Sequence, residues 1–380
     1  MNQTDRFSDI RPYTNLEANQ KIKELLSDPV FTRVLLGLYN DPNVVEQIKQ
    51  KLSMVQTIEQ LQRDFTYGMV KMIIETTTDG LTFSGVERLE KNKAYLFVSN
   101  HRDIILDSAF LNYMTYDYGM NTTQIAIGDN LFAYNWIVHA VKLNRSFVVK
   151  RNIGVRELLT ASKVLSDYIR TTIRDNNISV WIAQGEGRTK DGDDKTQQGL
   201  LKMLHMSNDK GFLEGITELN IIPVSISYEI EPCGIAKVNE TLQKDKDGFH
   251  KTLKDDLKSM AMGVKNQKGR VHFSFGKPIH TFLEGIDEEA KTNDLLQGVA
   301  ELIDKRIHCN FMLWPNNYAA HDILFENDTY KNLYTAEEKK KFEGLLNEAI
   351  TAIGDHQDEV RERFLKLYAN PVINANKYDS

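Results

Sequence analysis

The stretch YLFVSNHRDIILDSAF, residues 95–110, indicates the fold class of the whole chain. It begins with an apolar run of strand length, continues through a polar turn, and ends in an apolar run with helical spacing. A strand that leads through a short turn into a helix is the unit of α/β sheets. The turn also contains His101, Arg102 and Asp103, so the same stretch carries candidate chemistry.

Similar units continue on both sides of this stretch. Strand-length runs recur as AYLFVS, QIAIG, SFVVK, SVWIA, IIPVSISY and VHFSFG, and longer segments with a period of 3.6 residues separate them. Residues 15–78 and the chain after about residue 281 have helical periodicity only. We therefore expect an α/β fold, a mixed sheet flanked by helices, with helical segments at both ends. The expected division is a helical N-terminal segment (1–80), an α/β domain (81–285) and a helical C-terminal segment (286–380).

The composition excludes several classes of protein. With 380 residues and a net charge of −6, the chain has no overall basic field, and we expect no nucleic-acid partner. Its two cysteines, Cys233 and Cys309, lack metal-ligand spacing, so we expect two buried thiols and no metal. The first fifteen residues are polar, and no apolar run approaches the ~20 residues that span a bilayer. We expect a cytoplasmic protein, in which any membrane contact is made from the surface, at the inner face of the membrane.

The triplet His101-Arg102-Asp103 is also the start of a protein-kinase catalytic loop, but the rest of the kinase pattern is missing. A kinase needs an Asn where this chain has Ser108, and neither a DFG triplet nor a glycine-rich loop occurs. A serine hydrolase is disfavoured as well, because the chain contains no GxSxG elbow.

A histidine of near-neutral pKa can act instead as the general base of acyl transfer. It takes the proton of an attacking alcohol, provided that a carboxylate orients the ring. Asp107 and Asp103 are the two candidates for that carboxylate. Residues five or six positions apart on a helix are rotated by ~140° or ~240°, so they do not share a face. His101 is therefore predicted in the turn and the aspartate at the start of the helix.

Four blocks in order resemble the phospholipid/glycerol acyltransferase superfamily, which includes the glycerol-3-phosphate and lysophosphatidate acyltransferases. These blocks are SNHRDIILD (99–107), LNRSFVVKR (143–151), WIAQGEGRTKDG (181–192) and NIIPVSISYE (220–229). The resemblance covers roughly residues 83–280 and implies that family's α/β core. It also implies an O-acyltransferase of phospholipid biosynthesis, which moves a fatty acyl group from acyl carrier protein or acyl-CoA to a hydroxyl of a glycerol-phosphate-type acceptor, with no cofactor.

The chain departs from the family in one respect. The family spaces its histidine and aspartate by four residues, and that position here is Leu106. Asp107 comes one residue later, and the LDSAF segment aligns with the family's aspartate and the residues after it. The resemblance therefore favours Asp107 as the partner of His101 and leaves Asp103 as the alternative.

The resemblance also implies ligands for the acceptor's phosphate. In the second block Lys150 and Arg151 are predicted on opposite faces of a strand, so we expect one of them in the site, and Arg151 is favoured. An arginine fork binds phosphate oxygens in pairs.

The third block contains Glu186, Gly187 and Arg188. The resemblance implies that Arg188 is a second candidate phosphate ligand and that Glu186 and Gly187 shape the acceptor pocket. Lys195 is a weaker candidate. The GxG spacing lacks the third glycine of a dinucleotide fingerprint.

Two alternatives remain open at this point. The acceptor can be lysophosphatidate or another lysolipid, or the protein can be a non-catalytic lipid-binding protein on the same scaffold, which the irregular His–Asp spacing suggests. The segment NLFAYNWIVHAVKLN, 130–144, combines apolar and basic residues and is a candidate for peripheral contact with an anionic membrane.

Overall fold

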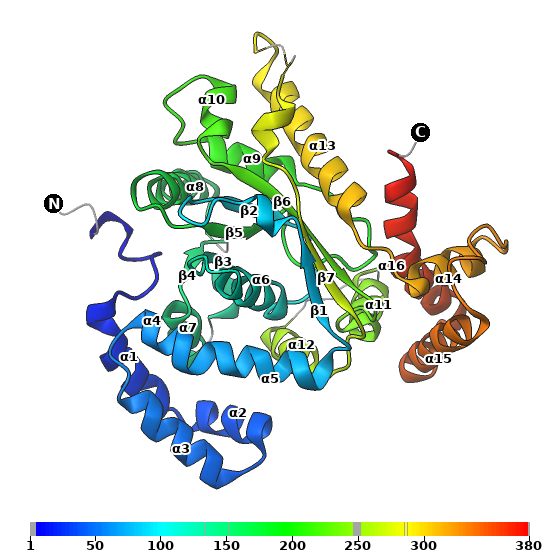
Figure 1. Cartoon of the computed structure of the whole chain (residues 1–380), viewed down its shortest axis with the longest axis horizontal. Coiled ribbons are helices and arrows are strands. Elements are labelled where there is room, and N and C mark those ends of the chain that lie inside the picture. The colour runs from blue at the N-terminus through cyan, green and yellow to red at the C-terminus, as the bar shows by residue number, and fades with distance from the viewer. Residues whose placement is uncertain are drawn as a thin grey trace.

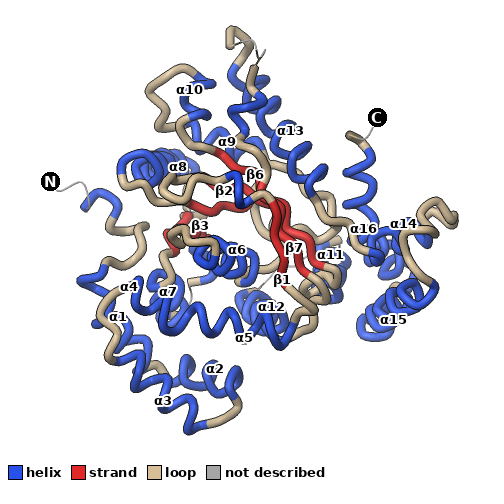
Figure 2. Tube along the Cα trace, in the orientation of Figure 1, coloured by secondary structure: helices blue, strands red, loops and turns tan. Residues whose placement is uncertain are grey.

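The computed structural model describes residues 5–132, 134–151, 153–245, 252–284, 286 and 288–378. Its centre is a seven-stranded sheet in the order β1-β7-β6-β2-β5-β3-β4 (Figures 1 and 2). Neighbouring strands are parallel except β6 and β7, which are antiparallel. The mixed α/β sheet predicted from the sequence is therefore confirmed. The strands are β1 (Leu81–Ser84), β2 (Leu96–Ser99), β3 (Gln124–Gly128), β4 (Ser146–Val149), β5 (Val180–Ala183), β6 (Ile221–Tyr228) and β7 (Val271–Phe275).

Helices cover both faces of the sheet, because successive side chains of a strand point to opposite faces. Leu96 and Val98 of β2 pack in a core cluster with α8, α9, α10 and α13, whereas Phe97 packs in a second cluster with α5 and α6. Figure 1 shows these two layers on either side of the strands. The helices that surround the sheet are α5 (Tyr67–Thr77), α6 (Leu106–Asp117), α7 (Asn135–Leu143), α8 (Val155–Arg170), α9 (Gln198–His205), α10 (Phe212–Thr217), α11 (Gly234–Lys244), α12 (Leu253–Lys265) and α13 (Thr292–Asn310).

The N-terminal helices have a core of their own, which also takes in Leu143 of α7. Asp28 and Asp41 accept hydrogen bonds from the first backbone N–H groups of α2 and α3, and each is followed by a proline at the first helical position. These are strong helix-start signals, which explains why the sequence predicts these helices well. The helices are α1 (Asn15–Ser27), α2 (Pro29–Tyr39), α3 (Pro42–Ser53) and α4 (Ile58–Leu61), and a π-helical segment, η2 (Gln62–Thr66), joins α4 to α5.

The C-terminal helices form a further cluster with α11 at one end of the sheet (Figure 1). They are α14 (Pro315–Leu324), α15 (Ala336–Ile353) and α16 (Gln357–Asn376). The preceding helix α13 packs on the sheet itself. The division of the chain at residues 80 and 285 stays a prediction, and residue 285 lies outside the described residues.

Two features differ from the sequence-based expectations. Strand β1 was not expected, because it is a four-residue edge strand whose side chains are mostly exposed and therefore lack an apolar pattern. Cys233 is buried as expected, but Cys309 is exposed. The remaining short elements are the 3₁₀ turns η1 (Asp5–Phe7), η3 (Val86–Arg88), η4 (Asp129–Leu131) and η6 (Ile279–Phe282) and the π-helical segment η5 (Thr171–Asp175).

Candidate active site

His101 lies in the loop between β2 and α6, where the sequence places it. The loop begins at the carboxyl end of β2, a central strand, and this edge is where open α/β sheets commonly bind ligands. The backbone N–H of Thr189 donates a hydrogen bond to the His101 carbonyl oxygen at 2.9 Å. The first and third sequence blocks therefore meet at this edge of the sheet.

Asp107 is the carboxylate that contacts the histidine ring. His101 Nδ1 lies 2.8 Å from Asp107 Oδ2. The same oxygen accepts the backbone N–H groups of Arg102 at 2.6 Å and Asp103 at 3.0 Å. Three groups of the loop thus surround one carboxylate oxygen. In this conformation the loop accommodates five residues between His101 and Asp107, one more than the family's spacing.

Asp103 has a different position, at the start of α6. Its Oδ1 accepts the backbone N–H groups of Ile105 at 2.9 Å and Leu106 at 2.8 Å, in the manner of a helix cap. Burial raises the pKa of Asp103, and the nearby charge of Asp107 raises it further. Of the two candidate aspartates, Asp107 has the geometry of the histidine's partner.

The histidine ring is held so that its second nitrogen is available. Since a carboxylate only accepts, Nδ1 donates to Asp107, and in a neutral ring this arrangement leaves the lone pair on Nε2. Trp181 packs edge-on against the ring with centroids 5.6 Å apart. The side chain is 15% exposed and lines a cavity, and no described residue forms a hydrogen bond with Nε2. This is the geometry of a general base.

Arg102, next to the histidine, is fully buried in an ionic network that sequence reasoning missed. Its guanidinium pairs with Asp194 and, at 3.1 Å, with Glu231. Lys237 pairs with Glu231 and donates to the Arg102 carbonyl oxygen at 2.7 Å. The two cations and two carboxylates balance, as buried charges must. The network anchors the histidine loop to α11 and to the loop that precedes α9.

Arg188 is the candidate phosphate ligand with the clearest position. It is only 6% exposed, it lines the cavity beside His101, and its Nη1 has no acceptor among the described residues. A buried guanidinium nitrogen without a partner is costly. An anionic group within reach of that nitrogen would satisfy it.

Arg151 and Glu186 lie together at the same cavity. Arg151 Nη1 is 3.2 Å from Glu186 Oε1, and both side chains are partly or largely exposed. Arg151 also packs over Gly128, where an added Cβ would come 2.8 Å from Nε. Gly187 lines the cavity with a left-handed backbone, φ +74°, which favours glycine there.

The two lysine candidates are placed less favourably. Lys150 lines the cavity, but its amine lies 3.6 Å from Asp9. Lys195 is 65% exposed, pairs with Asp193 at 2.5 Å, and does not line the cavity. Neither the binding nor the catalytic roles predicted from the sequence are tested by position alone, and they stay predictions.

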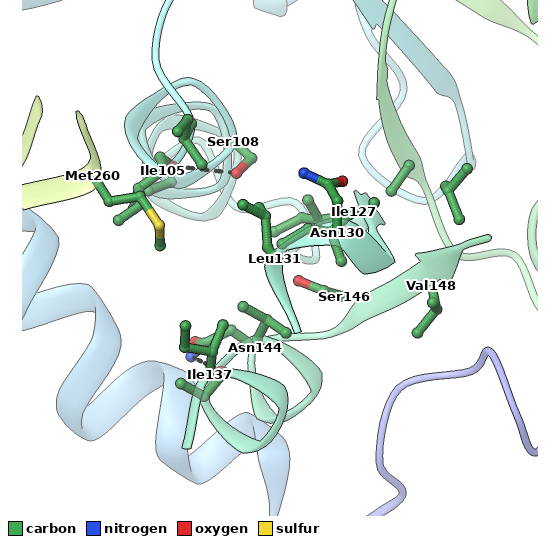
Figure 3. A pocket seen from close by; sticks show the side chains of 18 of the residues that line it. Ile105, Ser108, Ile127, Asn130, Leu131, Ile137, Asn144, Ser146, Val148 and Met260 are labelled. Carbon is green, nitrogen blue, oxygen red and sulfur yellow. Dashed lines mark hydrogen bonds between the residues drawn. The ribbon is translucent and has the colours of Figure 1, made fainter. Parts of the chain in front are cut away.

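The cavity has a volume of about 1910 Å³ and runs from the polar groups around His101 into an apolar interior. Its apolar wall comes from α6, β3, β4, α7 and α12, with residues such as Ile105, Ile127, Ile137, Val148 and Met260 pointing into it (Figure 3). Helix α2 of the N-terminal segment forms a further part of the wall. The N-terminal helices therefore shape this cavity together with the sheet.

The described residues of the segment considered for membrane contact, 130–132 and 134–144, are partly buried, although Tyr134 is exposed. Leu131 and Trp136 line the cavity, Val138 is half-buried, and Lys142 is buried at the end of α7. Apolar residues of this segment line the cavity, and its contact with a membrane stays a prediction.

Two kinds of feature are absent from the described part of the chain. No helix there is long and apolar enough to cross a membrane. Nor do three or more His, Cys, Asp or Glu side chains gather there in a way that fits a metal ion.

Comparison with known proteins gives one family match. Residues 80–228 match the family model described as Acyltransferase. No curated protein matches the chain.

Two solved structures are similar over long stretches. The 1-acyl-sn-glycerophosphate acyltransferase PlsC from Thermotoga maritima has 13% identity and a TM-score of 0.34, over 76% of this chain and 92% of that one. The signal recognition particle 54 kDa protein from Aeropyrum pernix has 8% identity and a TM-score of 0.21, over 94% and 99%. These scores are too low to support a functional argument, whereas the family match covers the histidine loop, Arg151, Arg188 and Tyr228. Residues 80–228 of this chain therefore match the acyltransferase family model, in agreement with the resemblance of the four sequence blocks to the phospholipid/glycerol acyltransferase superfamily.

Proposed function

We propose that the protein is an O-acyltransferase that moves a fatty acyl group from an acyl thioester to a hydroxyl of a phosphorylated glycerol acceptor. The observation that carries this proposal is the arrangement of His101, Asp107 and Arg188 at one cavity. A histidine oriented by a carboxylate faces the cavity through Nε2, and a buried arginine with an unpaired Nη1 lines the same cavity.

The proposed reaction uses His101 as base and then as acid. Nε2 takes the proton of the acceptor hydroxyl while the oxygen attacks the thioester carbonyl carbon, so a carbon–oxygen bond forms and a tetrahedral oxyanion results. The carbon–sulfur bond then breaks, and the departing thiolate takes the proton from His101. The products are the ester and the free thiol, and Asp107 steadies the transient imidazolium.

The binding roles follow from charge and polarity. Arg188 and Arg151 bind the acceptor's phosphate, and Glu186 holds the more exposed Arg151 in place. Gly187 leaves room for the acceptor. The apolar interior of the cavity holds the acyl chain.

Glycerol 3-phosphate is the proposed acceptor, and a lysolipid such as lysophosphatidate is the second candidate. The size of the cavity supports a lysolipid as the second candidate acceptor. Ligand pockets commonly measure about 300–1,000 Å³. A cavity of about 1910 Å³ has room for more than one chain. The donor is acyl carrier protein or acyl-CoA, and a peripheral contact with the membrane is part of the proposal.

The test is turnover by purified protein with labelled acyl-CoA or acyl-acyl carrier protein and a panel of acceptors: glycerol 3-phosphate, lysophosphatidate and other lysolipids. We expect turnover with at least one pair and loss of ~10²-fold or more in kcat for His101→Ala. Wild-type activity in His101→Ala contradicts the mechanism. If the protein binds lipid but turns over none of the donor–acceptor pairs, the result supports the non-catalytic lipid-binding alternative.

A further inference from the structure

Tyr228 lies directly behind the catalytic carboxylate, although it is 121 residues away in the sequence. It is the last residue of β6, and the alternation of the strand places it on the same face as Val224 and Ile226, towards α6. The ring is buried in this cluster, with 2% of its surface exposed. The hydroxyl donates a hydrogen bond to Asp107 Oδ1 at 2.9 Å.

The two carboxylate oxygens of Asp107 accept different numbers of hydrogen bonds. Oδ2 receives three hydrogen bonds, all from the loop of residues 101–103. Oδ1 receives one, from Tyr228, and no other described residue donates to it. Because Asp107 is fully buried, solvent does not replace a missing donor. Tyr228 is therefore the single contact among the described residues that fixes the carboxylate from the side opposite the histidine.

The hydroxyl is suited to act as a permanent donor. Burial raises the pKa of Tyr228 well above its usual value, and the charges of Asp107 and Asp103 raise it further. Tyr228 does not line the cavity, so it has no direct route to a bound substrate.

We propose that Tyr228 is a positioning residue for the acyl transfer: it fixes the orientation of Asp107, which in turn holds the His101 ring with Nε2 towards the cavity. This inference rests on the proposed function for its effect on turnover. The underlying contact, from Tyr228 through Asp107 to His101, is testable without turnover.

The experiment compares Tyr228→Phe with Tyr95→Phe. Tyr95 is a matched control, because it is 3% exposed, packs in the same core cluster, and its hydroxyl accepts one hydrogen bond, from Glu90 N–H at 2.8 Å. It precedes β2, at the end of that strand away from His101, and does not line the cavity. Both variants remove one buried hydroxyl and keep the ring.

We expect Tyr228→Phe to lower kcat on the order of 10- to 100-fold, the effect of losing a hydrogen bond to a charged group, with KM for both substrates unchanged. Tyr95→Phe keeps the wild-type kcat. The proton NMR resonance of His101 Nδ1–H, identified by its loss in His101→Ala, shifts in Tyr228→Phe and stays in place in Tyr95→Phe.

A double-mutant cycle tests the route of the effect. If Tyr228 acts through Asp107, Tyr228→Phe causes no further loss of kcat in an Asp107→Asn background. If Tyr228→Phe is too unstable for kinetics at the assay temperature, the NMR comparison decides the question, since it is read at lower temperature.

A Tyr228→Phe variant with wild-type kcat and an unshifted His101 resonance overturns the inference, as does equal loss in the Tyr95→Phe control. Failure of the proposed function is a separate outcome: it is indicated by wild-type turnover in His101→Ala, whatever the NMR comparison shows for Tyr228.

Discussion

Arg102 and Glu231 form an ion pair, Nη1 to Oε2 at 3.1 Å, that is buried beneath the loop of His101. The pair joins the residue next to the proposed base to the segment after β6. Charges of this kind are costly to bury, so they are tolerated only when every charge has a partner. Removal of one partner therefore lowers the stability of the fold more than replacement of the whole pair does.

We expect Arg102→Met to lower the free energy of unfolding by about 3–5 kcal/mol, because it leaves Asp194 and Glu231 buried with fewer cations. Arg174→Met is the matched control, since Arg174 pairs with Asp175 at the surface and such pairs contribute less than about 1 kcal/mol. Urea denaturation of both variants checks the difference. Equal stability of the two contradicts the role given to the buried network.

The two candidate aspartates are separated by their amide variants. Asp107→Asn is expected to lower kcat by about 10²–10⁴-fold, because an amide does not hold His101 in the required tautomer. Asp103→Asn is expected to stay near the wild-type rate, since asparagine caps a helix as well as aspartate does. Steady-state kinetics measure both, and the reverse order of effects would show that Asp103 is the orienting carboxylate.

The phosphate ligands are tested through KM for the acceptor. Loss of one charge-assisted contact in Arg188→Met is expected to raise this KM about 10- to 100-fold. Gly128→Ala is expected to raise it by a smaller factor, because the new methyl group would come 2.4 Å from Asn130 Oδ1 and 2.8 Å from Arg151 Nε, so both side chains have to move.

Gly298→Ala in α13 is the control for the glycine substitution, since nothing lies within 4 Å of its added Cβ and Gly298 does not line the cavity. Unchanged acceptor KM in both Arg188→Met and Gly128→Ala contradicts phosphate binding at these arginines.

Lys268 predicts a pH dependence of stability. Burial lowers the pKa of its amine from 10.5 to about 8. Between these two values the unfolded chain binds a proton that the folded protein does not, so the stability of the folded state rises with pH across this window and is lower below it. Lys268→Met removes this contribution. The rise in unfolding free energy between about pH 8 and pH 10 should therefore be smaller in the variant than in the wild type, and equal slopes contradict the lowered pKa.

Several elements of the fold follow from local sequence signals. Strands β2 to β7 are short apolar runs between polar turns, and α2 and α3 begin with an aspartate cap and a proline. The position of His101 in a turn before α6 also follows, since the helix period excludes a shared helical face. Strand β1 has no such signal, because it pairs with β7 through its backbone and through polar contacts of Thr82 and Ser84 with His272, which leave no apolar pattern in the sequence.

The candidate site also has some features that local sequence signals predict and others that they do not. The HRDIILD block predicts that a histidine and an aspartate lie in one loop, and the structure agrees that Asp107 is the closer partner. The block does not indicate that Arg102 is a buried anchor, since its partners Asp194 and Glu231 are 92 and 129 residues away. In the sequence Arg102 is indistinguishable from a solvated turn residue.

By itself, the sequence determined the order of strands and helices, the acyltransferase motifs and the place of the candidate base, because each of these depends on residues close together in the chain. Only the tertiary structure decided which groups satisfy Asp107 and Arg102, that residues of α7 line a cavity, and that Arg188, which lines the same cavity, has a buried Nη1 without an acceptor among the described residues. The physical reason is that burial removes water from these groups, so their state depends on partners that distant segments supply once the sheet and its helices have packed.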